Sequence, residues 1–318
     1  MIYGSVCSGI EAATVAWEPL GWKPAWFSEI EPFPNSVLKY RYPDIPNLGD
    51  MTEDYAKQTF KKGGIDLLVG GTPCQSFSQA GLRKAFGDPR GDLARKFLGV
   101  VEISKPKWFV WENVAGVLSA DRGLAFREFT RQIQKLGYGF AWRVLDAQYF
   151  GIPQRRRRIF VIGHRRDWRC AARVLFEQEM LQRDFTANER EKEISPKIRS
   201  GPQKSNRVEG VDVYNNADTG DIAVTFGANS GSTNTHGPKV VDTKGIRKLT
   251  PSECERLMGF PVGYTQVAHK GKPVTKCLAS WRYKALGNSI VIPVLAEIGS
   301  RIKLINSLET TGYANREK

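Results

Sequence analysis

A buried strand and the loop that follows it are predicted at the centre of the fold by residues 65–81, IDLLVGGTPCQSFSQAG. Its first seven residues form an apolar run of the kind expected for a strand buried on both faces of a parallel sheet. A proline then fixes the backbone just before Cys74, and small polar residues follow, which predicts a loop. Doubly wound sheets bind their ligands at the carboxyl ends of such strands. From these residues alone, Cys74 can be an inert loop residue, a redox group, a metal ligand or a nucleophile.

The same pattern of short apolar runs occurs at other places in the chain. The predicted strands are residues 2–7, 24–31, 105–114 and 157–164, and the predicted helices are residues 11–20 and 126–136. Strands that alternate with helices predict an α/β fold, with a parallel sheet covered by helices on both faces. Most of the unusual polar residues would then lie at one edge of the sheet. They are Cys7, Glu29, Glu31, Asp50, Cys74 and Glu112.

The sequence also predicts two domains. Residues 167–243 are polar and rich in glycine, serine, asparagine and threonine, which indicates a smaller, loop-rich domain. We expect residues 1–166 to form the large domain and residues 244–318 to return to it. Regular structure is expected to resume at Thr250, since Glu253 three residues later completes the pattern of a helix capping box.

Charge and cysteine usage narrow the class of protein. The chain of 318 residues carries a net charge of +14, and eight arginines lie between Arg155 and Arg173, a balance that attracts polyanions such as nucleic acids. Five cysteines are scattered without a CxxC pair and three histidines are well separated, so we expect neither a disulfide framework nor a metal site. No signal-type N-terminus and no apolar run of about 18 residues appears. We therefore expect a cytoplasmic protein without a membrane span.

Residues at the predicted strand ends suit a nucleoside cofactor. The turn CSGIEAA, residues 7–13, leads into a helix, and its glycine permits a ligand to approach the backbone N–H groups. Glu29 or Glu31 at the end of the second strand suits ribose hydroxyl groups, and Asp50 can accept a hydrogen bond from an exocyclic amine. The full G-x-G-x-x-G pattern is missing, which favours a cofactor without pyrophosphate. Taken singly, such an acidic residue is more often a solvated cap.

Glu112 follows the apolar run WFVW, residues 108–111. A carboxyl group at the buried end of such a strand is expected to have a raised pKa, which suits a proton donor near neutral pH. The alternative is a structural carboxylate that caps a neighbouring helix.

Five blocks of sequence occur in a characteristic order: TPCQSFS, WENV, QRRRRIFVIG, RKLTPSECERLMGFP and YKALGNSIVIPV. In these blocks and their spacing the chain resembles the cytosine-5 DNA methyltransferases over nearly its whole length, apart from about residues 167–243. The resemblance implies a Rossmann-like sheet that binds S-adenosylmethionine and releases S-adenosylhomocysteine. It also implies a smaller target-recognition domain, with double-stranded DNA in the cleft between the two.

The resemblance also implies roles for single residues. Cys74 matches the nucleophile that adds to carbon 6 of a flipped-out cytosine, and Glu112 matches the acid at nitrogen 3. Arg156 and Arg158 match the paired arginines that contact the base, and residues 73–91 match a loop that closes over it. The implied cofactor residues are Cys7, Ser8, Gly9, Ile10, Glu29, Ile30, Asp50, Met51, Pro73, Leu93, Asn288 and Ser289. The residues expected to contact nucleic acid are Gln75, Arg90, Arg155 and Arg157.

The turn at residues 7–12 departs from the family pattern aromatic-x-Gly-x-Gly-Gly. It reads CSGIEA, so only Gly9 remains, Cys7 stands where an aromatic ring commonly packs on adenine, and Glu11 and Ala12 replace glycines. We expect cofactor binding to survive, with altered affinity or geometry.

Other functions stay open at the level of sequence. A catalytically impaired DNA-binding relative, a tRNA cytosine-5 methyltransferase and a thiol redox enzyme are the alternatives, although the Cys-Phe-Thr signature of the tRNA branch is missing. We expect a monomer from a bacterium or phage, and a cognate restriction endonuclease, where one exists, would act independently.

Overall fold

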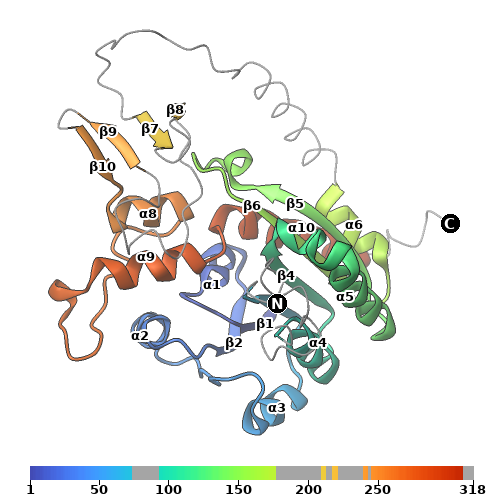
Figure 1. The fold of residues 1–318 in the computed structure, drawn as a ribbon. Coiled ribbons are helices and arrows are strands. Elements are labelled where there is room, and N and C mark those ends of the chain that lie inside the picture. Colours follow the sequence, from blue (N-terminus) through green and yellow to red (C-terminus); the bar gives the residue numbers. More distant parts are fainter. Residues whose placement is uncertain (74–92, 177–208, 213–216, 221–238, 243–244, 311–318) are drawn as a thin grey trace.

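The computed structural model describes residues 1–73, 93–176, 209–212, 217–220, 239–242 and 245–310 (Figure 1). Cys74, Gln75 and Arg90, to which the sequence analysis assigns roles, lie outside the described residues.

A six-stranded sheet forms the centre of the molecule, and its strands lie in the order β2-β1-β3-β4-β6-β5. The strands are β1 (Ile2–Val6), β2 (Lys23–Ser28), β3 (Leu67–Gly71), β4 (Trp108–Val114), β5 (Gly139–Asp146) and β6 (Arg157–His164). Strands β2, β1, β3 and β4 are parallel, as the apolar runs predict. The expectation of a wholly parallel sheet is wrong, because β6 runs antiparallel to both β4 and β5. The link between β5 and β6 is too short for the crossover that a parallel pair requires.

Helices cover both faces of this sheet, as predicted. The α-helices are α1 (Ala12–Trp17), α2 (Pro32–Arg41), α3 (Asp54–Lys61), α4 (Leu93–Ser104), α5 (Leu124–Lys135), α6 (Trp168–Phe176), α8 (Pro251–Met258), α9 (Ala279–Asn288) and α10 (Ile292–Thr310). Short 3₁₀ helices are η1 (Glu18–Leu20), η3 (Ala115–Leu118), η4 (Ala120–Gly123), η5 (Ala147–Phe150) and η6 (Val274–Lys276).

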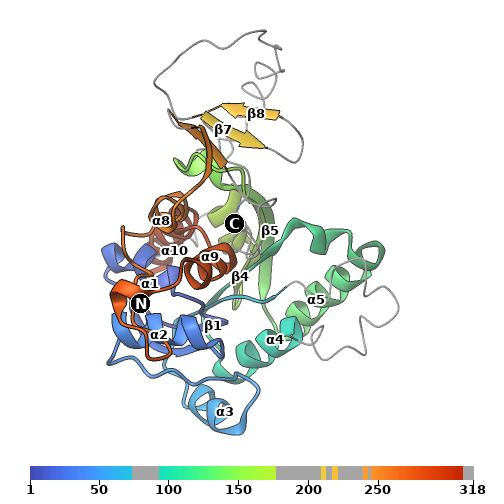
Figure 2. The same ribbon diagram turned by 60° about the vertical axis from the view of Figure 1, so that its left-hand side comes forward.

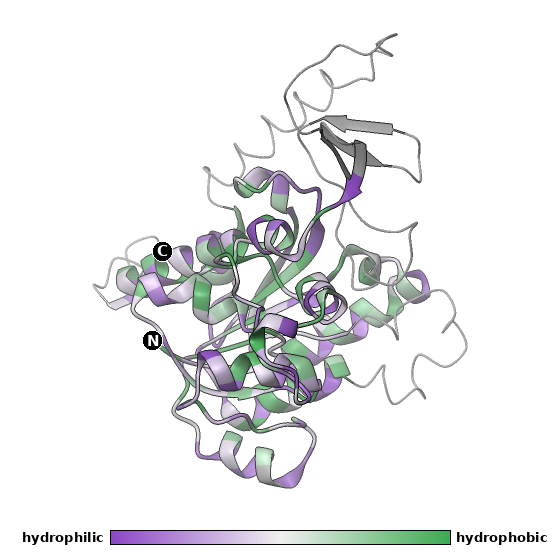
Figure 3. Ribbon diagram, turned by 90° about the vertical axis from the view of Figure 1, so that its left-hand side faces the viewer, coloured by the Kyte–Doolittle hydropathy of each residue, from purple (hydrophilic) through white to green (hydrophobic). Residues whose placement is uncertain are grey.

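Alternate residues of the strands supply two hydrophobic cores, one on each face of the sheet. Leu67 and Trp108 pack with α1, α6 and α10, whereas the next residues along, Leu68 and Phe109, pack with α3, α4 and α5. Figure 3 shows the apolar residues gathered in the sheet and along the inner sides of the helices. The stretch Ala279–Thr310 has the length and apolar composition of a membrane span, but 61% of its most apolar window is buried in the protein. A core helix meets the same criterion, and α10 is one.

A second, antiparallel sheet has the strand order β10-β9-β7-β8, from β7 (Glu209–Asp212), β8 (Ala217–Gly220), β9 (Lys239–Asp242) and β10 (Gly245–Lys248). Figures 1 and 2 show it projecting from the large sheet, on the side away from α3. Helix α6 packs on β5, β6 and α10, although the predicted division assigns it to the small domain. Strand β10 pairs with β9, although the division assigns it to the large one. We therefore propose a small domain between α6 and α8.

The chain returns to the large domain through the predicted capping box. The Thr250 hydroxyl accepts a hydrogen bond from the Glu253 N–H at 3.3 Å, and the Thr250 N–H donates to Glu253 Oε2 at 2.6 Å. The start of α8 is therefore confirmed as the sequence predicts it.

Candidate functional site

Glu112 lies at the carboxyl end of β4, beside the end of β3. The register of the two strands pairs Gly71 with Glu112. A β-carbon built on Gly71 would lie 3.0 Å from Glu112 Oε2, so the glycine lets the carboxyl group approach the neighbouring strand. Strand β3 then leads through Thr72 and Pro73 to Cys74, three residues beyond Gly71. The topology thus brings the chain that carries the predicted nucleophile to the predicted acid.

The carboxyl group of Glu112 is buried and paired with an arginine. Glu112 is 8% exposed, and Arg158 Nε lies 3.3 Å from its Oε1. Burial raises the pKa of Glu112, while the charges of Arg158 and Arg156 lower it to a smaller extent. The group therefore holds a proton more readily than an exposed glutamate, as the apolar run before it predicts.

Residues 155–158 alternate in exposure along the extended chain that enters β6. Arg155 and Arg157 are exposed, whereas Arg156 is buried and Arg158 is half-buried. Alternate side chains of an extended segment point to opposite sides. The two arginines expected to contact nucleic acid are therefore open to solvent, and the two assigned to catalysis face inward.

Arg156 and Arg158 have different partners, although the sequence analysis treats them as a pair. Arg158 pairs with Glu112, whereas Arg156 Nη2 donates to the carbonyl oxygens of Gly287 at 3.0 Å and Ser289 at 2.8 Å. The Arg156 backbone N–H donates to Asp146 Oδ1 at 2.8 Å. Burial, together with the nearby charge of Arg158, lowers the pKa of Arg156 to about 9. Arg156 thus holds the end of α9 against the start of β6.

Glu29 organises the predicted cofactor end of the sheet. Its Oε2 accepts a hydrogen bond from the Gly9 N–H at 2.7 Å, and its Oε1 accepts from the N–H groups of Ile30 and Glu31 at 2.8 and 2.7 Å. Burial raises the pKa of Glu29, and the three N–H bonds lower it to a smaller extent. The carboxyl group therefore joins the turn after β1 to the loop after β2.

The surroundings of Glu29 fit a nucleoside. A β-carbon built on Gly9 would meet no atom within 4 Å among the described residues, so space is open beside that backbone. Ile30 is 65% exposed and presents an apolar surface next to Glu29. Asp50 is only partly buried, and its Oδ1 accepts from the Thr52 N–H at 2.8 Å. An acid, an apolar surface and open backbone are what the ribose, the base and the close approach of a ligand require.

The other predicted cofactor residues differ in how much of their side chain is available. Ile10 and Met51 are buried in the core, so their side chains serve packing. Cys7 is half-buried, and burial raises the pKa of its thiol to about 12, which leaves it protonated at neutral pH. Asn288 and Pro73 are exposed, Ser8 and Leu93 are half-buried, and Ser289 is buried.

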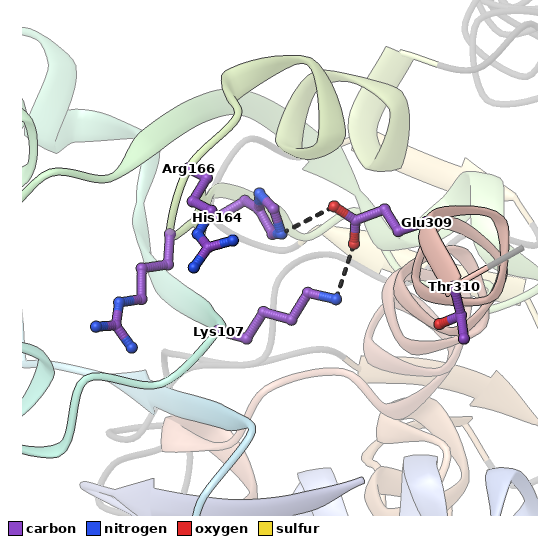
Figure 4. Close-up of a pocket in the computed structure, with 6 residues that line it drawn as sticks. Lys107, His164, Arg166, Glu309 and Thr310 are labelled. Atoms are coloured by element: carbon purple, nitrogen blue, oxygen red, sulfur yellow. Dashed lines mark ion pairs between the residues drawn. The ribbon is translucent and has the colours of Figure 1, made fainter. Parts of the chain in front are cut away.

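A polar cluster lies at the opposite edge of the sheet (Figure 4). Its pocket of about 400 Å³ is lined by Lys107, His164, Arg165, Arg166, Glu309 and Thr310. Lys107 Nζ lies 2.8 Å from Glu309 Oε2, and His164 Nε2 lies 3.5 Å from Glu309 Oε1. His164 is paired with Trp108, the first residue of β4, so the cluster is remote from Glu112.

The cluster has the donor atoms of a metal site but not the expected arrangement. Cys170 Sγ lies 3.5 Å from Glu309 Oε1, and donor atoms of His164, Cys170 and Glu309 lie within 4.8 Å of one another. The Asp167 N–H donates to His164 Nδ1 at 3.2 Å, so the neutral ring carries its proton on Nε2, the nitrogen that faces Glu309. Histidine ligands usually show the reverse arrangement. We interpret the cluster as a set of polar contacts that hold α10 against β4 and β6.

The family follows from comparison with known proteins. A family model described as C-5 cytosine-specific DNA methylase matches residues 1–225 and 187–304. The chain belongs to this family. Type II methyltransferase M.HhaI from Haemophilus parahaemolyticus is 31% identical, and the alignment covers 93% of this chain and 92% of that methylase.

Another relative of this chain comes from Escherichia phage P1 and is named DNA N-6-adenine-methyltransferase. It is 33% identical over all of this chain, but this chain covers only 63% of its length. Two solved structures share the fold. Spodoptera frugiperda DNMT2 has a TM-score of 0.67 and 16% identity, and the match covers 95% of this chain and 99% of that one. S. pombe Dnmt2 has a TM-score of 0.63 and 18% identity, and the match covers 98% of this chain and 99% of that one. The α/β methyltransferase fold predicted from the sequence is thereby confirmed.

Proposed function

We propose that this chain is a DNA cytosine-5 methyltransferase that works through a covalent adduct between Cys74 and cytosine. The buried Glu112, paired with Arg158 beside the strand that leads to Cys74, is the observation that carries the proposal. Membership of the C-5 cytosine-specific DNA methylase family supports it. Bound S-adenosylmethionine would supply an electrophilic methyl group on its sulfonium.

Cys74 and Glu112 act on different atoms of the cytosine ring. The Cys74 thiolate forms a bond to carbon 6, and the electron pair of the carbon 5–carbon 6 double bond makes carbon 5 nucleophilic. Glu112 supplies a proton at nitrogen 3, which neutralises the negative charge that the addition creates. After carbon 5 has been methylated, its proton leaves to solvent, the carbon–sulfur bond breaks to release the thiolate, and nitrogen 3 returns its proton to Glu112. Because carbon 6 is out of reach in stacked DNA, the base must first be flipped out.

Further residues are proposed to bind the two substrates. Glu29 would accept hydrogen bonds from the cofactor ribose, with Ile30 against its base and Asp50 near its amine. Arg155 and Arg157, both exposed, would contact phosphates and position the duplex. The small domain between α6 and α8 would read the target sequence. Gln75 and Arg90 remain predictions of contacts with the DNA.

The decisive experiment must distinguish the two bases, since the phage P1 relative is named for adenine methylation. DNA from cells that express the chain is digested, and 5-methylcytosine and N6-methyladenine are measured by mass spectrometry. We expect 5-methylcytosine from the native chain and none from Cys74→Ser, which should still bind DNA. A target containing 5-fluorocytosine should trap a covalent adduct, because fluorine cannot leave as a proton does. N6-methyladenine without 5-methylcytosine, or full activity of Cys74→Ser, would refute the proposal.

A further inference from the structure

The turn between β1 and α1 has an unusual backbone for its sequence. Cys7, Gly9 and Glu11 all have positive φ, at 49°, 57° and 63°, although only one of them is glycine. For residues with a β-carbon this conformation costs free energy and persists only where the surroundings hold it. Glu11 also occupies one of the two positions at which this chain lacks a glycine of the family pattern.

One carboxyl oxygen of Glu11 holds the turn in place. Glu11 Oε1 accepts hydrogen bonds from the Thr14 N–H at 3.2 Å and from the Thr14 hydroxyl at 3.1 Å, which caps α1. The Thr14 hydroxyl also bonds to the Tyr3 hydroxyl of β1 at 2.6 Å. The Glu11 N–H donates to the Ser8 carbonyl at 2.9 Å and closes the turn. The hydrogen bonds of the Glu11 side chain thus hold a positive φ that glycine would adopt without strain.

The other carboxyl oxygen of Glu11 is buried and has no hydrogen-bond partner among the described residues. Glu11 as a whole is 1% exposed. Burial raises the pKa of Glu11 to about 7, with a smaller contribution from the charge of Glu29, while the nearby Ser5 hydroxyl and the hydrogen bonds from Thr14 lower it. The titratable groups that face it from the surrounding elements are Tyr3, Glu29, Tyr42 and Tyr264. These phenols and this acid carry no positive charge, and Arg41, whose guanidinium lies 4.9 Å from the centre of the Tyr264 ring, donates to the carbonyl oxygens of Gly263 and Tyr264.

The turn that Glu11 holds is the one that meets Glu29. Gly9 lies two residues before Glu11, and its N–H donates to Glu29 Oε2 at 2.7 Å. Between these residues, Ile10 is fixed by its carbonyl oxygen, which accepts from the Tyr264 hydroxyl at 2.8 Å. A second negative charge on Glu11 would repel the Glu29 carboxylate across this short turn. An uncharged Glu11 avoids that repulsion and keeps the Oε1 cap.

We propose that Glu11 is a positioning residue of the cofactor site, whose uncharged carboxyl group holds residues 7–11 in the shape that S-adenosylmethionine requires. Loss of its proton loosens the turn and weakens cofactor binding. The inference rests on the proposed function in one respect, that the open space beside Gly9 is the cofactor site. It adds that this methylase binds its cofactor best on the acidic side of neutrality.

The test uses the full chain and S-adenosylhomocysteine, whose affinity is measured by calorimetry between pH 6 and pH 8.5. Glu11→Gln keeps the size and the Oε1 cap but cannot ionise, and Glu18→Gln, at an exposed glutamate of η1, is the matched control. The dissociation constant of the native chain and of the control should rise about tenfold across this range, whereas that of Glu11→Gln should change less than twofold. At pH 8, repeating the titration in buffers of different ionisation enthalpy should show proton uptake on binding by the native chain and none by Glu11→Gln.

Two results separate failure of this inference from failure of the proposed function. Parallel pH dependences of the native chain and Glu11→Gln, with tight binding in both, would overturn the role of Glu11 and leave the cofactor site intact. Absence of binding to both at pH 6 would count against the cofactor site itself. Glu11→Gly restores the family residue but removes the cap, and we expect weaker binding at every pH. Native affinity in that variant would also overturn the inference.

Discussion

The ion pair between Glu112 and Arg158 should couple the two residues in a manner that depends on pH. The changes are Glu112→Gln, Arg158→Met and both together. At 3.3 Å, two unit charges attract by about 5 kcal/mol at an effective dielectric constant of 20. The side chains are 11% and 18% exposed, so water screens part of this attraction. We therefore expect a coupling free energy of about 2 to 3 kcal/mol at pH 8.

The sign of the pH dependence follows from the raised pKa of Glu112. A carboxyl group whose folded pKa exceeds its unfolded value stabilises the fold at low pH and loses that contribution as the pH rises through the folded pKa. Removing Arg158 raises the pKa of Glu112 further, because the arginine charge lowers it. At pH 5 the variant Arg158→Met can protonate Glu112 and avoid an unpaired charge. The coupling should therefore fall below about 1 kcal/mol at pH 5.

Urea-induced unfolding, followed by tryptophan fluorescence, measures the free energy of each variant at the two pH values. The chain has eight tryptophans, and Trp111 is buried on β4 next to Glu112. A coupling below about 0.5 kcal/mol at pH 8, or one that grows on acidification, would show that Arg158 does not neutralise Glu112. The assignment of Glu112 as a buried acid held by Arg158 would then be wrong.

Two further predictions concern packing and DNA binding. A β-carbon on Gly163 would lie 1.9 Å from the ring of the buried Phe109, so Gly163→Ala should destabilise the fold by about 1 to 3 kcal/mol in thermal unfolding. Gly99→Ala in α4, where a β-carbon meets no atom of the described residues within 4 Å, should instead stabilise by roughly 0.5 kcal/mol, and a loss in both would contradict this packing. Arg157→Met should reduce the salt dependence of DNA binding by about one phosphate contact, whereas Arg127→Met on α5 should leave it unchanged. Equal slopes for these two arginine variants would place the DNA elsewhere.

The large sheet could be predicted from the sequence because its signal is local. The apolar run at residues 65–71 became β3, and the run at residues 157–164 became β6 with the same bounds. These strands are apolar on both faces, so the runs are continuous and easily seen. The direction of β6 could not be predicted in this way, because an antiparallel central strand is as apolar as a parallel one. It depends on the length of the link from β5, and the sequence analysis predicts no strand at residues 139–146.

The position of Glu11 shows a second limit of prediction from sequence. A glutamate in place of glycine predicts that the turn differs, but periodicity does not indicate whether the side chain points to the ligand or into the core. The direction is decided by Thr14, whose N–H and hydroxyl both donate to the carboxyl group behind the turn. A carboxyl group that finds two bonds in the core stays there, even with its other oxygen unpaired. The departure from the family pattern thus moved a polar group behind the site, where it acts through the backbone.

Arg156 links the C-terminal part of the chain to the candidate site around Glu112. A guanidinium that is 3% exposed, with a pKa lowered to about 9, is costly to bury, and replacing buried charges by apolar groups often stabilises proteins. Stability alone therefore does not explain its presence. Its bonds to the carbonyl oxygens of Gly287 and Ser289 enclose Asn288, a predicted cofactor residue, and its neighbour Arg158 holds Glu112. Arg156, directly before β6, and Arg158, within it, would thus hold the predicted end of the cofactor pocket and the predicted acid at a fixed separation, because only Arg157 lies between them. Methyl transfer requires such a fixed separation between base and cofactor, and an apolar residue at position 156 would not provide it.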